Sequence, residues 1–310
     1  MFSSDKEKGA LEMVAAMMLS GTIGYFVIES GQSFWNVVFF RCLIGSLFLA
    51  AYVAATKQFR KEMITVSVLG VIIAAGVTLV GNWVLLFASF DYIPFSIATI
   101  AYHMQPMMLV LVSALLTRQL PGFNTMLGLI VAMIGLGLVV GIPLDDIWAV
   151  IRGESKADGA VWGLLLALGA AFLYTITTLL TKQVSHVPAS VIAVIQVFLG
   201  GLFLLPWVNF EELPIEASSW GSLLFLGLVN TGFMYVIMYD GFQRLSTSLI
   251  AILSFIYPVT ALFVDYLAFD HTITVLQGVG VVLILLAICA VKFNWHMSFR
   301  VRDRLSHQRP

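Results

Sequence analysis

The second half of this 310-residue chain repeats the pattern of the first half at a shift of 152 residues, which places Pro106 on Pro258 without a gap. The other coincidences at this shift are Phe90 with Phe242, Ser96 with Ser248, Ile100 with Ile252, Leu115 with Leu267 and Gly128 with Gly280. Weak internal symmetry of this kind indicates two copies of one structural unit within a single chain. The fold must therefore be one that builds the same unit twice.

Apolar segments fill nearly all of both halves. The chain is 60% hydrophobic and 11% charged, whereas a soluble domain carries about 25% charged residues. A helix that crosses a membrane needs about 20 mainly apolar residues, so most of this chain is expected to lie in the lipid bilayer. The sequence indicates ten spans, at roughly 11–28, 34–55, 65–90, 93–116, 123–142, 160–181, 188–208, 219–240, 246–268 and 273–293.

Each half holds five of these spans, and an odd number of crossings turns the second copy upside down. The sequence thus predicts an all-α integral membrane protein with ten transmembrane helices, arranged as two inverted five-helix repeats around a central cavity. We expect the first repeat at 1–142, an extracytoplasmic linker at 143–159, the second repeat at 160–293 and a basic cytoplasmic tail at 294–310. Inverted repeats are the architecture of many secondary transporters, whose solute site lies between the copies.

Positive charge is distributed unevenly over the two ends of the predicted spans. If the N-terminus is cytoplasmic, 13 of the 16 Lys and Arg residues lie on the cytoplasmic side, and only Arg152 and Lys156 lie outside. This bias predicts that both termini are cytoplasmic and that the protein is a multi-pass protein of the inner (plasma) membrane. The net charge of −1 gives no reason to expect a nucleic-acid partner. A signal peptide is the alternative for the first span, but no clear cleavage site follows it.

A polar stripe runs along the fourth span and is partly repeated in the ninth. On the fourth it includes Ser96, Thr99 and His103, and on the ninth Ser254 lies on the stripe with Tyr257 beside it. Because unsatisfied polar groups are costly in hydrocarbon, such a stripe must face protein or water. It therefore lines either a solute pathway or a contact between helices, and the sequence leaves both interpretations open.

Other spans carry polar and aromatic residues that are expected to support the same pathway. They are Tyr25, Asn82, Trp83, Tyr174, Asn230 and Tyr235. Aromatic residues form 13% of the chain, and a cavity that they line would suit planar or amphipathic organic solutes.

Pro106 and Pro258 lie near the middle of their spans, where each removes a backbone donor and bends the helix. Their matching positions in the two halves predict hinges of a moving gate. Gly128 and Gly280, each 22 residues after its proline, are expected instead to allow close contact between helices.

Few titratable side chains are placed within the spans. Arg41 needs a carboxylate, carbonyl oxygens or water as its partner, and both an ion pair and solute binding are open for it. Asp240 and Asp265 lie near span ends, where a solvated or paired carboxylate costs less free energy than at the centre of the bilayer. Proton coupling through His103 or Asp265 is a further hypothesis.

The duplicated spacing, with Arg41 on the second span, resembles the drug/metabolite transporter superfamily, in particular its ten-helix EamA-type members. The resemblance covers nearly the whole chain. It departs at Gln119 and His271, where family members often have Glu, and at Ala287, the counterpart of Gly135. The resemblance implies a bundle that alternates between inward and outward openings and exports or exchanges amino acids, related metabolites or drugs.

The predicted function is therefore secondary transport of a small organic solute, with amino acids and related amphipathic or aromatic compounds as the first hypothesis. The alternative is a membrane-embedded enzyme that acts on a lipid or lipid-linked group, although the sequence shows no catalytic motif of the common kinds. No metal or cofactor is expected, because Cys42 and Cys289 are isolated within apolar spans. The sequence leaves open whether the chain forms a homodimer.

Overall fold

The computed structural model describes residues 2–93, 95–141, 159–269 and 272–293, and the side chains of 2–4 and 95–96 are left aside. Within this part, ten helical segments are long and apolar enough to cross a membrane, from Asp5–Ser30 to Val275–Lys292. The predicted all-α architecture with ten spans is confirmed. Residues 143–158 of the predicted linker and the whole predicted tail 294–310 lie outside the described residues.

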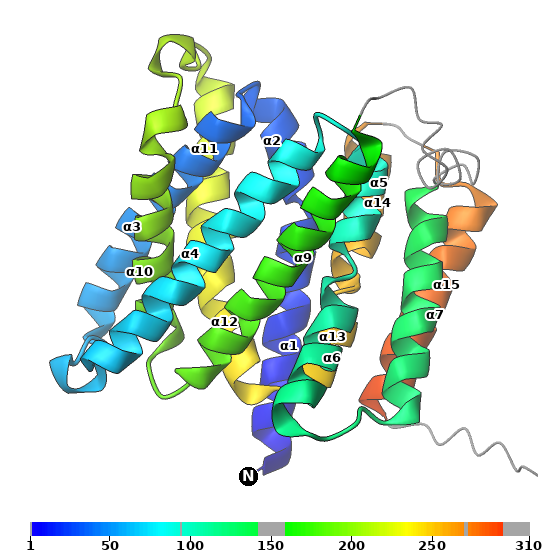
Figure 1. Ribbon diagram of the computed structural model, residues 1–310. Helices are drawn as coiled ribbons and strands as arrows, with labels where there is room; N and C mark the ends of the chain where they lie inside the picture. The colour runs from blue at the N-terminus through cyan, green and yellow to red at the C-terminus, as the bar shows by residue number, and fades with distance from the viewer. Residues whose placement is uncertain (1, 94, 142–158, 270–271, 294–310) are drawn as a thin grey trace, which may run out of the picture.

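Several spans consist of more than one helical segment (Figure 1). The first half contains α1 (Phe2–Gly21), α2 (Ile23–Ser30), α3 (Phe34–Thr56), the 3-10 turn η1 (Lys61–Met63), α4 (Val66–Ser89), α5 (Phe95–Tyr102), α6 (Gln105–Thr117) and α7 (Phe123–Val140). The second half contains α9 (Ala160–Gln183), α10 (Ala189–Leu204), the 3-10 turns η2 (Leu205–Trp207) and η3 (Phe210–Glu212), α11 (Ala217–Gly227), the π-helical turn η4 (Leu228–Phe233), α12 (Met234–Arg244), α13 (Thr247–Leu253), α14 (Ile256–Ala268) and α15 (Val275–Lys292).

Hydroxyl side chains start several of these helices. Ser33, Thr65 and Ser246 each accept a hydrogen bond from the backbone N–H three residues further on. Thr274 forms a full capping box with Gln277 at the start of α15. These caps satisfy donors that a helix leaves free in its first turn, so the span boundaries follow local sequence as well as hydrophobicity.

The contacts between the two halves have the symmetry of an inverted repeat. The helix α4 packs on α9, and α12, which ends the span equivalent to α4, packs on α1. In the same way α6 packs on α9 while α14 packs on α1. The equivalent pairs α3 with α10 and α7 with α15 pack directly on each other. The two halves therefore surround one common axis, as inverted repeats do.

The contact between α7 and α15 is close because glycines form it. A Cβ atom on Gly135 would lie 2.7 Å from the Gly280 carbonyl oxygen, and a Cβ atom on Gly280 would lie 2.5 Å from the Gly135 carbonyl oxygen. Gly128 lies against the Val291 side chain. Close approach through small residues is a common way for membrane helices to pack. The expectation that Gly128 and Gly280 allow helix contact is thus met.

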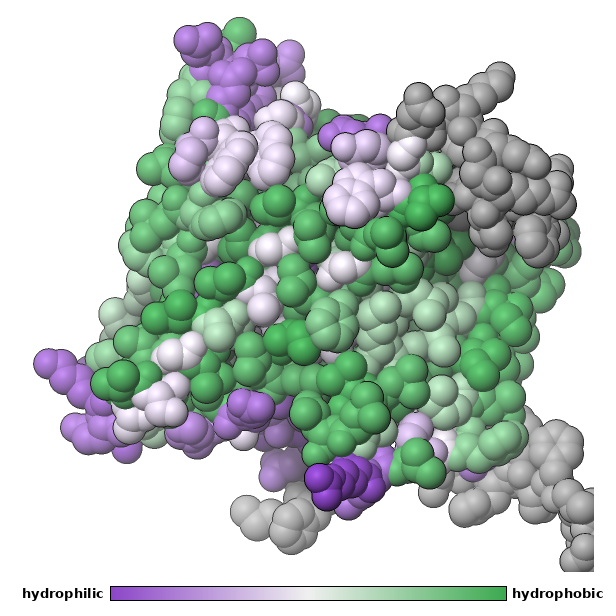
Figure 2. Space-filling view, viewed as in Figure 1, coloured by the Kyte–Doolittle hydropathy of each residue, from purple (hydrophilic) through white to green (hydrophobic). Residues whose placement is uncertain are grey.

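Hydrophobic side chains cover the outer surface between two more hydrophilic ends. Figure 2 shows them as a broad band over α4, α9 and α7. Leu47, Val77 and Leu115 are among the apolar side chains more than 60% exposed on this surface. A soluble monomer rarely exposes apolar patches of this extent, so the chain is a multi-pass membrane protein.

Candidate functional site

A cavity of about 290 Å³ lies between the two halves. Its lining comes from α1 to α6 of the first half and from α9, α12 and the junction of α13 with α14 in the second. The lining residues are Met17, Ser20, Ile23, Gly24, Val27, Phe34, Val37, Val38, Arg41, Trp83, Leu86, Phe87, Phe90, Thr99, Tyr102, His103, Gln105, Pro106, Tyr174, Met234, Tyr235, Met238, Ser254 and Tyr257. Its volume is close to the lower end of the range for small-molecule sites.

The cavity occupies one side of the membrane more than the other. The helices α3 and α4 contribute only residues 34–41 and 83–90, which lie next to the turns at 31–33 and 90–93. Pro106 and Ser254, which also belong to the lining, lie near the middle of their spans. The cavity therefore extends from mid-bundle toward the end that the charge pattern assigns to the outside.

Helix interruptions surround this cavity. The α5 helix ends at Tyr102 and α6 begins at Gln105, so the fourth span is broken just before Pro106. The ninth span is broken at the equivalent place, between Leu253 and Ile256, just before Pro258. A proline cannot donate to the carbonyl four residues earlier, which explains why both spans break there. The helix interruptions before these prolines are present, and their use as hinges stays a prediction.

Two stacked ring pairs form the floor of the cavity. The His103 and Tyr257 rings stack at a centroid distance of 5.4 Å and an interplanar angle of 17°, and Tyr102 stacks on Tyr174 at 6.2 Å and 19°. His103 is 7% exposed, and its Nδ1 lies 2.7 Å from the Thr99 carbonyl oxygen. Because a carbonyl oxygen only accepts, Nδ1 carries the hydrogen and the ring is fixed in one orientation. The floor is thus rigid, aromatic and weakly polar.

Many of the side chains predicted for the pathway line this cavity. They are Trp83, Thr99, His103, Tyr174, Tyr235, Ser254 and Tyr257, together with Pro106 and Arg41. They come from six spans, and the bundle brings them together. Their use by a solute stays a prediction.

Other predicted residues lie outside the lining. Tyr25 packs on Phe269 at a ring distance of 5.8 Å. Asn82 is fully buried and donates from Nδ2 to the Leu79 carbonyl oxygen at 3.0 Å. Asn230 donates from Nδ2 to the Leu19 carbonyl oxygen at 2.7 Å, which ties η4 to the end of α1. Backbone carbonyls therefore accept from the amide nitrogens of Asn82 and Asn230, whereas the amide oxygens of both side chains are buried without a hydrogen-bond partner among the described residues. The role of these residues in the pathway stays a prediction.

The remaining predicted positions are spread over the structure. Pro258 is buried in α14, and the side chain of Ser96 belongs to those left aside. Asp240 pairs with Arg244 near the end of α12, and Asp265 lies in α14 outside the cavity lining.

Sequence reasoning missed the apolar part of the lining. Met17, Phe34, Phe87 and Met238 all face the cavity, yet the same residue types also face lipid and other helices. Tyr102 was missed because the stripe was drawn on a continuous helix, whereas the break after Tyr102 changes which side chains face the cavity. The one sequence signal for Tyr102 was its position just before Pro106, where a proline interrupts the helix.

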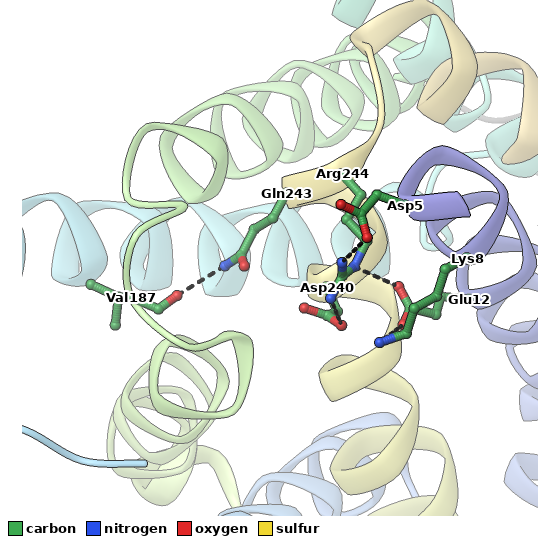
Figure 3. A network of polar contacts seen from close by, with 7 residues as sticks. All are labelled: Asp5, Lys8, Glu12, Val187, Asp240, Gln243 and Arg244. Carbon is green, nitrogen blue, oxygen red and sulfur yellow. Dashed lines mark hydrogen bonds and ion pairs between the residues drawn. The ribbon is translucent and has the colours of Figure 1, made fainter. Parts of the chain in front are cut away.

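Polar contacts close the bundle at the end opposite to the cavity (Figure 3). Arg244 at the end of α12 reaches Asp5 and Glu12 of α1 at 3.6 and 3.3 Å, and Asp240 of its own helix at 2.9 Å. Lys8 adds an ion pair with Glu12 at 3.5 Å. Arg244, Glu12 and Asp240 are partly buried, so their pairs are screened less than those of the exposed Asp5 and Lys8.

The α9 helix joins this closed end through a lysine. Lys182 Nζ donates to the carbonyl oxygens of Phe242 and Leu245 at 2.6 and 2.5 Å. The Gln243 amide donates to the Val187 carbonyl oxygen at 3.0 Å. The end of α12 is thus bound to α1, to α9 and to the turn before α10, and we call this set of contacts the inner contact cluster.

Comparison with known proteins identifies relatives along the whole chain. The EamA-like transporter family matches residues 7–141 and 161–293, which correspond to the two repeats. The uncharacterized transporter YxxF of Bacillus subtilis is 28% identical over 283 residues, covering 91% of this chain and 88% of the relative. The uncharacterized inner membrane transporter YicL of Salmonella typhimurium is 24% identical over 304 residues, covering 93% of this chain and 96% of that relative. A solved crystal structure superimposes with a TM-score of 0.77 at 18% identity and covers 92% of this chain and 98% of that one.

Proposed function

The chain belongs to the EamA-like transporter family, and we propose that it is a secondary transporter that moves a small organic solute by alternating access. The family membership supports transport. We place the protein in the inner membrane because one relative of nearly equal length bears that location in its name. We further propose export or exchange as its direction, and amino acids or related amphipathic and aromatic compounds as its solutes.

One observation carries the alternating-access part of this proposal. The cavity reaches mid-bundle from one end only, while the inner contact cluster joins α12 to α1 and α9 at the other end. In a transporter built from inverted repeats, rocking of the repeats closes one end and opens the other around a fixed midplane site. This arrangement supports a state that is open at the end which the charge pattern predicts to face outside.

The nature of the lining supports an organic solute. Aromatic rings of Trp83, Phe87, Tyr102, Tyr174 and Tyr257 surround the cavity. Such rings offer apolar faces together with a few hydroxyl and N–H groups that orient a ligand. The described lining contains no Asp or Glu, so an inorganic cation would find no carboxylate ligand there.

Counterflow in proteoliposomes tests the proposed function. Vesicles that contain the purified protein are preloaded with pools of amino acids or other small metabolites, and uptake of labelled aromatic amino acids is followed. A carrier gives saturable uptake that depends on the preloaded pool. If folded protein supports no exchange from any pool, the transport proposal for these solutes is wrong.

A further inference from the structure

Arg41 stands apart from the other residues of the cavity because it carries a permanent charge. It lies in the second turn of α3, inside the membrane-spanning segment. The described lining contains Arg41 but no Asp or Glu. A permanent cation within the bilayer is costly unless an anion, carbonyl oxygens or water accompany it, so a cavity with this composition favours a negatively charged occupant.

The guanidinium of Arg41 is held in place by one contact. Its Nε donates to Thr231 Oγ1 at 3.2 Å, and Thr231 Oγ1 in turn donates to the Leu226 carbonyl oxygen at 2.8 Å. Thr231 belongs to the π-helical turn η4, a rare backbone form that is frequent at functional sites. The contact joins α3 of the first half to η4 of the second half, so it fixes the side chain from both repeats.

This single contact leaves most of the donors of Arg41 unused. A guanidinium has five N–H donors in a planar fork, and among the described residues only the Nε donor has an acceptor. None of the ion pairs between described residues includes Arg41. The two Nη nitrogens of Arg41 are therefore available for the bidentate contact that a carboxylate makes best.

The surroundings of Arg41 supply a place for the rest of such a ligand. Tyr235 and Tyr257 line the same cavity as Arg41, and Tyr257 belongs to the stacked floor with His103. Two hydroxyls and several ring faces therefore share the cavity with the cation. A ligand with a carboxylate at one end and an apolar or aromatic body at the other matches this arrangement.

We propose that Arg41 binds the carboxylate of the transported solute, and that the solute is an organic acid with an apolar or aromatic body. This inference rests on the proposed function and narrows its solute class. The described lining offers no carboxylate to an ammonium group. An acid without an amino group is therefore expected to bind at least as tightly as the corresponding amino acid.

Four probes that share an aromatic body separate the effects of charge. They are phenylpropionate, its neutral amide phenylpropionamide, the zwitterion phenylalanine and the cation phenylpropylamine. Binding to the purified full-length protein is measured by thermal stabilisation and by competition in counterflow. The wild-type protein should bind phenylpropionate more tightly than the amide and the amine. The proposal is wrong if the amide binds as tightly as the acid.

Variants of Arg41 test whether this residue is responsible. Arg41→Gln should weaken phenylpropionate binding by roughly tenfold, because hydrogen bonds to charged groups are stronger than neutral ones, and should leave binding of the amide unchanged. Arg41→Lys keeps the charge but not the planar fork of donors. Its affinity for phenylpropionate should therefore lie between those of the wild type and of Arg41→Gln. Arg118→Gln removes the same charge at an exposed position outside the cavity and should bind like the wild type.

The outcomes distinguish this inference from the proposed function. Exchange without any preference for the acid, or an unchanged preference in Arg41→Gln, would overturn the role of Arg41 and leave transport standing. Binding of the acid that depends on Arg41, without exchange of any solute, would support the site and count against transport. Should Arg41→Gln fail to fold, Arg41→Lys replaces it: weaker binding of the acid with unchanged binding of the amide supports the role of Arg41, and an unchanged preference for the acid overturns it.

Discussion

Gly135 and Gly280 show how single residues fix the contact between the two repeats. A Cβ atom on Gly135 would lie 2.7 Å from a backbone oxygen of α15, and a backbone atom yields less easily than the end of a flexible side chain. Forcing extra atoms into a packed contact costs about 1–3 kcal/mol. Gly135→Ala and Gly280→Ala should therefore lower the melting temperature of the protein in detergent.

Two other glycines in the same helices serve as controls. A Cβ atom on Gly137 of α7 or Gly278 of α15 would have no other atom within 4 Å. Alanine at either position should leave the melting temperature unchanged or raise it slightly, since alanine favours helix more than glycine does. Equal loss of stability in all four variants would contradict the tight contact described here.

His103 is a residue at which a substitution is expected to slow transport. Its ring forms part of the cavity floor through Tyr257 and is oriented by the Thr99 carbonyl oxygen. His103→Ala should lower the rate of exchange in counterflow while the amount of folded protein is maintained. His186→Ala is the matched control, because His186 is exposed in the turn between α9 and α10. Unchanged transport kinetics in His103→Ala would remove this residue from the pathway.

At the scale of elements, we propose that the contacts at the end of α12 keep one side of the bundle closed. Arg244 joins three carboxylates of two helices. Arg244→Gln should weaken the inner contact cluster and increase the share of molecules open at that end. The rate at which a cysteine at Ser254 reacts with an impermeant thiol reagent from that face should rise.

Arg118→Gln provides the comparison for this prediction. Arg118 follows α6, is exposed and makes no ion pair among the described residues. Its removal changes the charge without touching the inner contact cluster, so labelling at Ser254 should stay at the wild-type rate. Equal effects of Arg244→Gln and Arg118→Gln would show that the total charge, and not the contact, controls opening.

The elements also show what the sequence predicts and what it cannot. The hydrophobicity of the sequence predicts the number and the length of the spans. The breaks before Pro106 and Pro258 follow because proline has no backbone N–H to donate. The π-helical turn η4 contains no proline, so this sequence signal does not predict it. Asn82 and Asn230 are predicted for the pathway because they are polar, and this stays a prediction, since both lie outside the cavity lining and their amide oxygens are buried without a hydrogen-bond partner among the described residues. Each amide nitrogen has a backbone carbonyl oxygen as its partner. Residue type alone does not identify that partner.

On the scale of the whole molecule, the shift that superimposes Pro106 on Pro258 predicted the arrangement of the two halves. Because each half has five spans, the two halves have opposite orientations in the membrane. The matching contacts of α4 with α9 and of α12 with α1 follow from this inversion. The cavity between the halves follows from the same symmetry. Its apolar lining does not, because residues such as Met17 and Phe87 are chemically the same as residues that face lipid.

The orientation of the molecule in the membrane is a separate prediction. The charge bias places the turn between α9 and α10 in the cytoplasm and the start of α11 outside. Cys42 and Cys289 are first replaced by alanine. A cysteine at the exposed Ser185 should then react with an impermeant reagent from the cytoplasmic face only, and one at the exposed Ser218 from the outer face only. Labelling of both from the same face would reject this topology.

Access to the cavity from both faces tests the central claim most directly. A single cysteine at Ser254, at the inner limit of the cavity, is exposed to an impermeant reagent from each face in turn, with Ser185→Cys and Ser218→Cys as markers of sidedness. Alternating access predicts that Ser254→Cys reacts from both faces and that the two rates change in opposite directions when Arg244→Gln is introduced. Reaction from one face only, in both backgrounds, would contradict the account.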